Sequence, residues 1–245
     1  MMRWFIDLSY RGAPFHGWQV QPGVVTVQSV IEGALERLRG CPVAITGAGR
    51  TDAGVNARRM IAHVDFPDDF DPREGTFMRS LNALCGPDIA IRSVWPVTAE
   101  AHARFDAVER SYRYFVHTAK DPFASGLSWQ APATLDFERM NEAAAALLGR
   151  RDFTSFSKLH TDVKTNICDL RAASWQRIDE SHWYFEIVAD RFLRNMVRAV
   201  VGTLVDVGRH KIDTQGVMAI LEARDRCSAG TSMPAGPLFL WDVKY

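Results

Sequence analysis

The chain has 245 residues, of which 47% are hydrophobic, 11% aromatic and 24% charged, a composition typical of a soluble globular protein with one large core or two smaller ones. The aromatic content argues against disorder, and no apolar stretch reaches the roughly 18 residues that a membrane helix needs. Its 29 basic and 29 acidic residues cancel, which argues against a protein that coats nucleic acid or membrane by bulk charge.

Cysteine and arginine usage narrow the class further. The four cysteines are scattered without a CxxC pair, so we expect neither a disulfide framework nor a thiolate zinc site, and a cytoplasmic location is the default. Residues 1–10 carry Arg3 and Asp7 among apolar side chains, which indicates a strand and not a signal peptide. Arginine supplies 24 of the basic residues, and its planar fork suits phosphate and bases, although codon bias toward arginine explains the count equally well.

Strands alternate with helices in the first half of the chain. Residues 3–9 form an apolar run of strand length, followed by a Gly- and Pro-containing loop at residues 10–23. Thr26 is the expected N-cap of a helix that ends at Gly40, because apolar residues recur on one helical face between them. Further strands are expected at residues 43–46, 60–66 and 89–94, and a helix at residues 77–84.

The second half repeats this order. A strand at residues 112–118 leads into a loop that resembles the first one, and Asp136 caps a helix that ends at Gly149. Glu32 and Glu142 take matching places in the two helices. A strand at residues 183–189 and a helix at residues 192–205 follow.

This repetition predicts a mixed α/β (α+β) protein of two similar lobes, residues 1–106 and residues 107–245. Chance similarity between two α/β halves is the alternative. If the symmetry is real, a cleft between the lobes is the natural binding site.

The segment Gly-Ala-Gly-Arg-Thr-Asp-Ala-Gly-Val, residues 47–55, holds the first candidate functional residue. A dinucleotide fingerprint does not fit, because Asp52 stands at the third glycine position and a strand follows instead of a helix. No Gly-Lys-Ser/Thr follows, so a P-loop does not fit either. The flanking glycines can project Asp52 from the loop, with Arg50 beside it; an Asp that only satisfies turn amides is the simpler alternative.

The expected helix at residues 192–205 carries the second candidate group. Opposite its apolar face lie Arg191, Arg194, Asn195, Arg198 and Gly202, at helical spacing. A solvated basic face is the ordinary meaning of such a stripe. Arg198 also neighbours apolar residues, and a partly buried Arg requires a carboxylate partner, for which Asp52 is suitable.

Two tyrosines at strand spacing, Tyr112 and Tyr114, form the third candidate group. They share one face of the sheet and are flanked by Arg104, Arg110 and Arg113. Aromatic rings among arginines can stack an unstacked base and hold its phosphates. A core role is the alternative, and we expect it for at least one of the pair.

Other catalytic patterns are absent from the sequence. The histidines form no HExxH or comparable pair, there is no GxSxG elbow, and no cysteine lies in a catalytic signature. What remains is a carboxylate, arginines and a tyrosine on two lobes. This set suits covalent or acid–base chemistry on an anionic, aromatic substrate.

Gly-Arg-Thr-Asp-Ala-Gly-Val, residues 49–55, resembles the signature of the tRNA pseudouridine synthase A (TruA) family. Matching segments follow in the correct order over nearly the whole chain: Tyr-Arg-Gly with Phe-His-Gly-Trp-Gln at residues 10–19, His-Ala-Arg-Phe at 102–105, Arg-Ser-Tyr-Arg-Tyr at 110–114, Asp-Phe-Thr-Ser-Phe at 152–156, and Phe-Leu-Arg-Asn-Met-Val-Arg at 192–198 with Val-Gly at 201–202. A chance match of this length and order is very improbable.

The resemblance implies two related lobes sharing a central, mainly antiparallel sheet with flanking helices, and an active cleft between them. It implies isomerisation of uridine to pseudouridine in the anticodon arm of tRNA, at positions 38, 39 and 40, by a cytoplasmic homodimer without cofactor or metal. By motif position, the resemblance makes Asp52 the catalytic aspartate and Arg198 the residue that pairs with it. Tyr112 is expected to stack on the flipped-out base and to assist proton removal, and Arg50 to replace the displaced nucleotide.

The remaining expectations concern RNA contacts and departures from the family pattern. Asn56 and Asn195 stand where many members carry His, which affects local hydrogen bonding more than the chemical step. We expect a basic cleft opposite an acidic surface at residues 65–74. A non-catalytic RNA-binding protein, or pseudouridylation of another RNA site, is the alternative function. The expected RNA-binding residues are Arg50, Arg58, Arg110, Arg113, Arg191 and Arg194.

Overall fold

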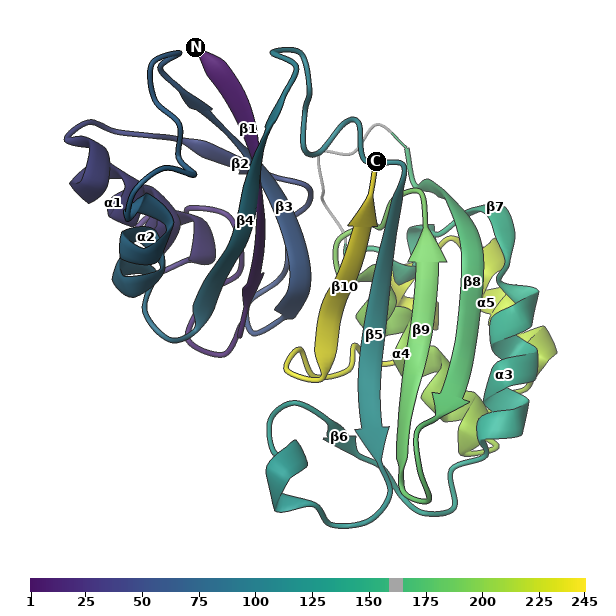
Figure 1. Cartoon of the computed structure of the whole chain (residues 1–245). Coiled ribbons are helices and arrows are strands. Elements are labelled where there is room, and N and C mark those ends of the chain that lie inside the picture. The colour runs from purple at the N-terminus through teal and green to yellow at the C-terminus, as the bar shows by residue number, and fades with distance from the viewer. Residues whose placement is uncertain (159–164) are drawn as a thin grey trace. The chain divides into compact units, whose positions relative to one another are not determined.

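A computed structural model describes residues 1–158 and 165–245 and divides the chain into two compact units (Figure 1). The first unit consists of Met1–Val108 together with Leu240–Tyr245, and the second of Glu109–Phe239. The last six residues therefore belong to the first unit, whereas the sequence analysis placed them in the C-terminal lobe.

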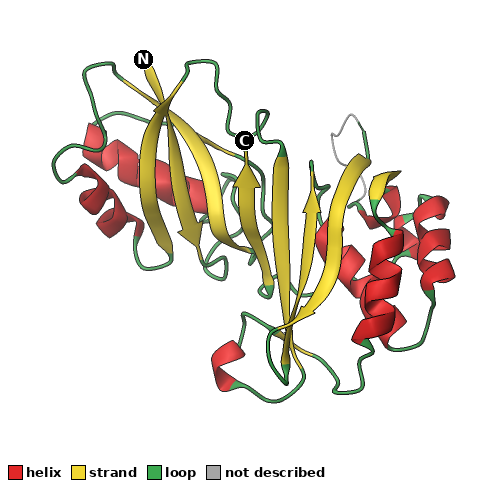
Figure 2. Cartoon of the chain, turned by 45° about the vertical axis from the view of Figure 1, so that its right-hand side comes forward, coloured by secondary structure: helices red, strands yellow, loops and turns green. Residues whose placement is uncertain are grey.

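The first unit is an antiparallel sheet with helices on one side. Strand β1 (Met2–Tyr10) lies between β3 (Asn56–Phe66) and β4 (Ile89–Val97), and β2 (Ile45–Gly47) pairs with β3. Helices α1 (Val27–Arg39) and α2 (Phe77–Cys85) cover the same side of these strands (Figures 1 and 2).

Helix α1 begins and ends where the sequence predicts. The Thr26 hydroxyl accepts a hydrogen bond from the backbone N–H of Ser29, and the Ser29 hydroxyl accepts one from the backbone N–H of Thr26. Both hydrogen bonds of a capping box are therefore present. Gly40 ends the helix at φ 69°, a left-handed conformation that glycine adopts without strain. The buried face of the helix consists of Val27, Ile31, Ala34 and Leu35.

The second unit is also a mainly antiparallel sheet covered on one face by helices (Figure 2). Its strands follow the order β5 (Glu109–His117), β9 (His182–Ala189), β8 (Ile167–Arg177) and β7 (Gly149–Asp152), and β6 (Trp129–Gln130) pairs in parallel with β5. Its helices are α3 (Phe137–Ala146), α4 (Met196–Gly208) and α5 (Thr214–Ala223), with short 3₁₀ turns η1 (Pro122–Ala124), η2 (Thr154–Phe156) and η3 (Arg226–Ser228). Strand β10 (Leu238–Lys244) begins in the second unit and ends in the first.

The predicted fold class, mixed α/β with a mainly antiparallel sheet and flanking helices, is confirmed. The helix expected at residues 192–205 is wrong at its N-terminal end, because α4 begins only at Met196. Asn195 precedes it at φ 66°, in the left-handed region, which cannot continue a right-handed helix. Residues 191–195 are therefore not helical, and the predicted stripe of arginines along one helix does not exist.

Both units use a helical amide side chain to fasten a strand. Asn82 of α2 binds the backbone N–H and C=O of Ile91, and Asn141 of α3 binds those of Trp175 in the same way. These buried strand groups would otherwise lack partners at the helix–sheet contact. The sequence analysis matched Glu32 with Glu142. In the structure Glu142 is exposed, and it is the neighbouring Asn141 that binds the backbone of strand β8.

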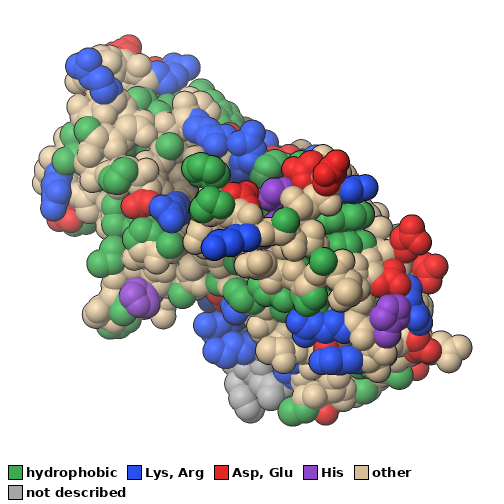
Figure 3. Space-filling view, turned by 90° about the horizontal axis from the view of Figure 1, so that it is seen from below, with side chains coloured by type: hydrophobic (Ala, Val, Ile, Leu, Met, Phe, Trp, Pro, Cys, Tyr) green, Lys and Arg blue, Asp and Glu red, His purple; other side chains and the backbone are tan. Residues whose placement is uncertain are grey.

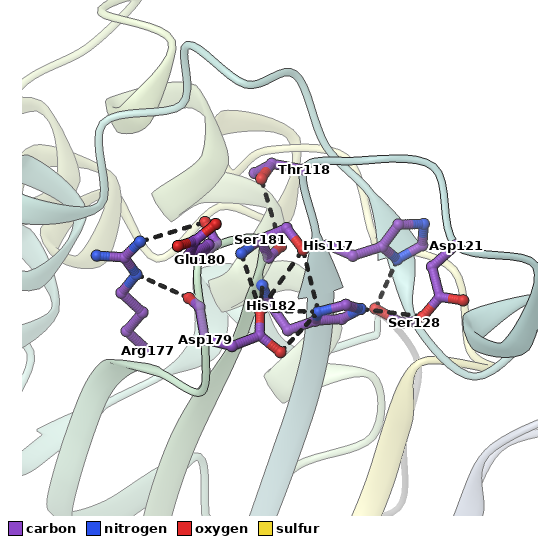
Figure 4. Close-up of polar contacts among 9 residues, drawn as sticks. All are labelled: His117, Thr118, Asp121, Ser128, Arg177, Asp179, Glu180, Ser181 and His182. Carbon is purple, nitrogen blue, oxygen red and sulfur yellow. Dashed lines mark hydrogen bonds and ion pairs between the residues drawn. The ribbon is translucent and has the colours of Figure 1, made fainter.

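A polar cluster holds the loop that follows β5 (Figure 4). The His182 ring lies between two carboxylates, with Nδ1 3.0 Å from Asp179 and Nε2 3.1 Å from Asp121. Asp121 also accepts the N–H of Phe123 at 2.8 Å and so begins η1. Hydrogen bonds to Asp179 and Asp121 raise the pKa of His182, while the backbone N–H of Ser181 and then His182 lower the pKa of Asp179 to about 2.

This arrangement predicts a pH-dependent contribution of His182 to stability. A raised histidine pKa stabilises the fold below the unfolded value of about 6.5, and that contribution disappears as pH rises through the folded pKa. The difference in unfolding free energy between wild type and His182→Gln should therefore be largest near pH 6 and shrink toward pH 9 in urea titrations. A difference that stays constant over this pH range would contradict a stabilising ion pair between protonated His182 and the carboxylates of Asp179 and Asp121.

Candidate active site

Asp52 lies on the loop between β2 and β3 of the first unit. The loop closes on itself through a hydrogen bond from the N–H of Val55 to the C=O of Asp52, 3.1 Å. Gly54 sits within this turn at φ 80°, which only glycine adopts without strain. Asp52 is half-buried and Arg50 is exposed, so the loop presents a carboxylate and a guanidinium within three residues.

The loop after β1 fixes the backbone on both sides of Asp52. The N–H of Trp18 donates to the C=O of Thr51 at 3.2 Å, and the N–H of Gly54 donates to the C=O of Phe15 at 3.3 Å. Gly17, at φ 89°, allows this approach, since a Cβ there would lie 2.6 Å from the Thr51 carbonyl oxygen. Two loops more than 30 residues apart in sequence thus form one rigid layer.

A buried pair of hydroxyl groups joins the two loops at the residue before Asp52. The Tyr10 hydroxyl lies 2.8 Å from Thr51 Oγ1, and both residues are buried. Such a bond in a low-dielectric site is costly to break when one partner stays buried. The bond therefore restrains the chain directly at the candidate catalytic residue.

Asn56 closes the other end of the same loop. Its Oδ1 accepts the N–H of Gly12 at 2.7 Å, and the residue is 1% exposed. A Cβ on Gly12 would lie 2.2 Å from the Val55 carbonyl oxygen, so the two backbones touch here. Asn56 is thus an internal acceptor that ties the two loops together, and its side chain has almost no surface with which to contact RNA.

Tyr112 and Tyr114 of β5 share a face of the second unit's sheet but differ in burial. Tyr114 is fully buried, and its hydroxyl has no hydrogen-bond partner within the described residues. Burial raises the pKa of Tyr114 above its usual range, and the nearby charge of Arg198 opposes this rise. Tyr112 is half-buried and meets the ring of Phe192 edge-on at 5.0 Å. Tyr114 is therefore the core member of the pair, and Tyr112 keeps surface for a ligand.

Arg198 is fastened in the first turn of α4. Its Nε donates to the C=O of Met233 at 2.5 Å, and its own C=O accepts the N–H of Met233 at 3.1 Å. Gly202 allows the neighbouring segment to pass, because a Cβ there would lie 1.9 Å from the Thr231 carbonyl oxygen. Asp52 belongs to the first unit and Arg198 to the second, so their pairing stays a prediction.

The other predicted RNA-binding arginines occupy separate places. In the first unit, Arg58 is exposed and lies 5.0 Å from the Trp241 ring. In the second, Arg110 donates to the C=O of Asp190 at 2.8 Å. Arg113 points to the opposite face of β5 from Tyr112, where it bonds Glu186 at 2.9 Å and lies over Tyr184. Arg191 and Arg194 lie in the non-helical segment before α4.

Charged side chains of both signs are mixed on one face of the protein (Figure 3). On the face in Figure 3, basic side chains form several separate groups with apolar and acidic side chains between them. The acidic segment at residues 65–74 is partly neutralised, since Asp65 forms a two-pronged ion pair with Arg3 at 2.8 Å. The basic cleft and acidic back stay predictions.

Within residues 1–158 and 165–245, no group of three or more His, Cys, Asp or Glu side chains is placed to hold a metal ion. None of the helices described in those ranges is both long and apolar enough to pass through a bilayer.

Comparison with known proteins shows which sequences this chain is similar to. A family model described as tRNA pseudouridine synthase matches residues 143–245. The chain is 54% identical over 246 residues to the tRNA pseudouridine synthase A of Parabacteroides distasonis, covering all of this chain and 96% of that one. It is 51% identical to the protein of the same name from Bacteroides thetaiotaomicron, covering 91% of it, and 38% identical to that from Bacillus subtilis, covering 99% of it. All of this chain is covered in both of these matches as well.

The hydroxyl pair predicts a specific stability pattern. Thr51→Val keeps the shape but leaves the Tyr10 hydroxyl without this partner, which should lower the free energy of unfolding by about 1–3 kcal/mol. Thr51→Ser keeps the hydroxyl and should cost less. The double variant Tyr10→Phe, Thr51→Val should cost less than the two single changes added together, as measured by urea unfolding. Strict additivity would show that the two hydroxyl groups do not interact.

Proposed function

Because this chain belongs to the tRNA pseudouridine synthase A family, we propose that it isomerises uridine to pseudouridine in the anticodon arm of tRNA, at positions 38 to 40. The observation that carries the proposal is the half-buried Asp52 on a loop whose neighbours Thr51, Gly54 and Val55 are all held by backbone hydrogen bonds. Such a loop can present a carboxylate to a substrate without reorganising.

The reaction explains why a carboxylate is needed. The bond from uracil N1 to ribose C1′ breaks, the detached base turns, and a bond from C5 to C1′ forms. The proton on C5 is then lost and N1 gains one. An ionised Asp52 can add to C6 of the base or assist cleavage at the sugar, and both routes require an oxygen nucleophile in a fixed position.

The substrate must first leave its stem. A stacked, paired uridine cannot reach a side chain on the protein, so the nucleotide flips out at a cost of a few kcal/mol. Stacking on the ring of Tyr112 returns about 1–3 kcal/mol of that cost. We propose that Arg50 fills the vacated place in the stem and that Arg198 pairs with Asp52 and favours its ionised form.

The remaining parts of the proposal concern assembly and location. We propose a homodimer that binds one tRNA across both subunits, acting in the cytoplasm without cofactor or metal. Further contacts to phosphate are proposed for Arg58, Arg110, Arg113, Arg191 and Arg194. Phosphate contacts of this kind position the RNA but carry no sequence information.

The direct test is release of tritium from tRNA labelled at C5 of uridine, with no metal added. Wild type should release tritium, because formation of the C5–C1′ bond displaces the C5 hydrogen. Asp52→Asn, which keeps the shape but not the charge, should release none yet bind tRNA with nearly the wild-type Kd. Asp69→Asn, an exposed acid of the same unit, serves as the matched control and should release tritium normally.

Each other outcome changes the assignment. Release by Asp52→Asn at the wild-type rate would show that another group is the nucleophile. If wild type binds tRNA but releases no tritium, the protein is a non-catalytic RNA-binding member of the fold. Release from other RNAs but not from the anticodon arm of tRNA would point to a different RNA site.

A further inference from the structure

The turn between β4 and β5 exposes a large aromatic side chain that the fold does not use. Phe105 is 74% exposed, and Arg104 beside it is exposed as well. The guanidinium carbon of Arg104 lies 5.8 Å from the centre of the Phe105 ring. Single exposed apolar side chains are common on protein surfaces, so exposure alone does not mark a site. What distinguishes Phe105 is the way in which its turn and its ring are held.

Hydrogen bonds hold this turn rigid from residue 102 to residue 106. His102 Nδ1 accepts the N–H groups of Arg104 and Phe105 at 3.1 and 3.3 Å. The N–H of His102 donates to the Asp106 carboxylate at 2.7 Å, and the N–H of Asp106 donates back to the C=O of His102. Every one of these backbone donors is thus satisfied inside the turn, which fixes the direction in which Phe105 projects.

The turn is also anchored to the core of the first unit. The N–H of Ala103, which is fully buried, donates to His63 Nδ1 at 3.1 Å, and the Tyr245 hydroxyl donates to the C=O of Ala103 at 2.6 Å. Burial, and then the charge of Arg3, lower the pKa of His63 to about 4, so its ring stays neutral and keeps accepting this bond at pH 7.

The aromatic rings continue outward from this anchor to the surface. The His63 ring meets the His102 ring edge-on at 4.7 Å, and the His102 ring lies against Phe105 at 4.2 Å with an angle of 31°. One face of the Phe105 ring therefore rests on His102, and 74% of the residue is exposed to solvent, with the guanidinium carbon of Arg104 5.8 Å from the ring centre. A preorganised, largely exposed ring is the form of a stacking platform.

We propose that the exposed ring of Phe105 stacks an unpaired base of the RNA substrate, while Arg104 contacts an adjacent phosphate. The inference rests on the proposed function for its RNA partner. An aromatic face beside a guanidinium matches a nucleobase joined to a phosphate, and the single-stranded loop of an anticodon arm contains unpaired bases that can stack in this way. A purely apolar protein surface is a poorer match, because it would offer no hydrogen-bond acceptor to the guanidinium of Arg104.

The test compares tRNA binding by Phe105→Leu and Phe105→Trp, with Phe123→Leu as the matched control. Phe123 is 93% exposed in the second unit, so its loss removes a similar exposed ring elsewhere. Phe105→Leu keeps apolar bulk but loses the aromatic face and should raise the Kd for tRNA about tenfold. Phe105→Trp should restore binding to within about twofold of wild type, and Phe123→Leu should leave the Kd unchanged.

The salt dependence separates the two side chains. Arg104→Ala should reduce the steepness of the plot of log K against log salt concentration by about 1, the amount expected for the loss of one phosphate contact. Phe105→Leu should leave that slope unchanged. Because Phe105 is exposed, Phe105→Leu should also keep the wild-type Tm. An unchanged Kd for tRNA in Phe105→Leu, or an equal loss of affinity in Phe123→Leu, would contradict the proposal that Phe105 stacks a base.

Two further outcomes keep this inference separate from the proposed function. If Phe105→Leu lowers the molecular mass of the free protein in sedimentation, the ring belongs to a contact between copies of this chain and the platform is wrong. Binding is measured independently of tritium release. An inactive wild type whose tRNA affinity still falls with Phe105→Leu would therefore refute the synthase and support the platform.

Discussion

The candidate active site depends on one close approach between two loops. The loop after β1 lies directly against the backbone at residues 51–55, and Gly12 and Gly17 permit contacts that any Cβ would block. The Tyr10–Thr51 hydroxyl pair and the bond from Gly12 to Asn56 then fasten the approach at both ends. The position of Asp52 thus depends on residues 10–18, which lie 34 to 42 positions earlier in the chain.

This constraint suits the proposed chemistry. A carboxylate that must meet C6 of uracil or the ribose gains most from being held in place before the substrate arrives, since orientation then costs nothing at the reacting step. The same principle is visible in the turn at residues 102–106, where internal hydrogen bonds hold an exposed ring in one direction. In both places, hydrogen bonds hold the backbone of the first unit, and the held backbone sets the direction of one side chain, Asp52 or Phe105.

Local patterns in the sequence predicted much of this fold. Helix α1 with its cap at Thr26 and its end at Gly40, α3 with its cap at Asp136, and the glycine-flanked loop of Asp52 follow from periodicity and turn chemistry between near neighbours. The expectation that at least one of the two tyrosines lies in the core is confirmed for Tyr114.

What the sequence did not predict involves distant contacts or one unusual backbone angle. The apolar period runs back through residues 192–195, and nothing in it reveals that Asn195 adopts φ 66° and delays α4. Strand β8 was missed because Asp169, Arg171 and Gln176 interrupt its apolar residues. The role of Asn56 could not be foreseen either, because its partner is a backbone N–H 44 residues away.

Mapping where pseudouridine forms tests the central claim most directly. An unmodified tRNA transcript would be treated with wild type or Asp52→Asn, then with a carbodiimide that marks pseudouridine, and read by primer extension. The account predicts stops within the anticodon arm for wild type and none for Asp52→Asn. Stops elsewhere in the tRNA, or the same stops with the variant, would contradict it.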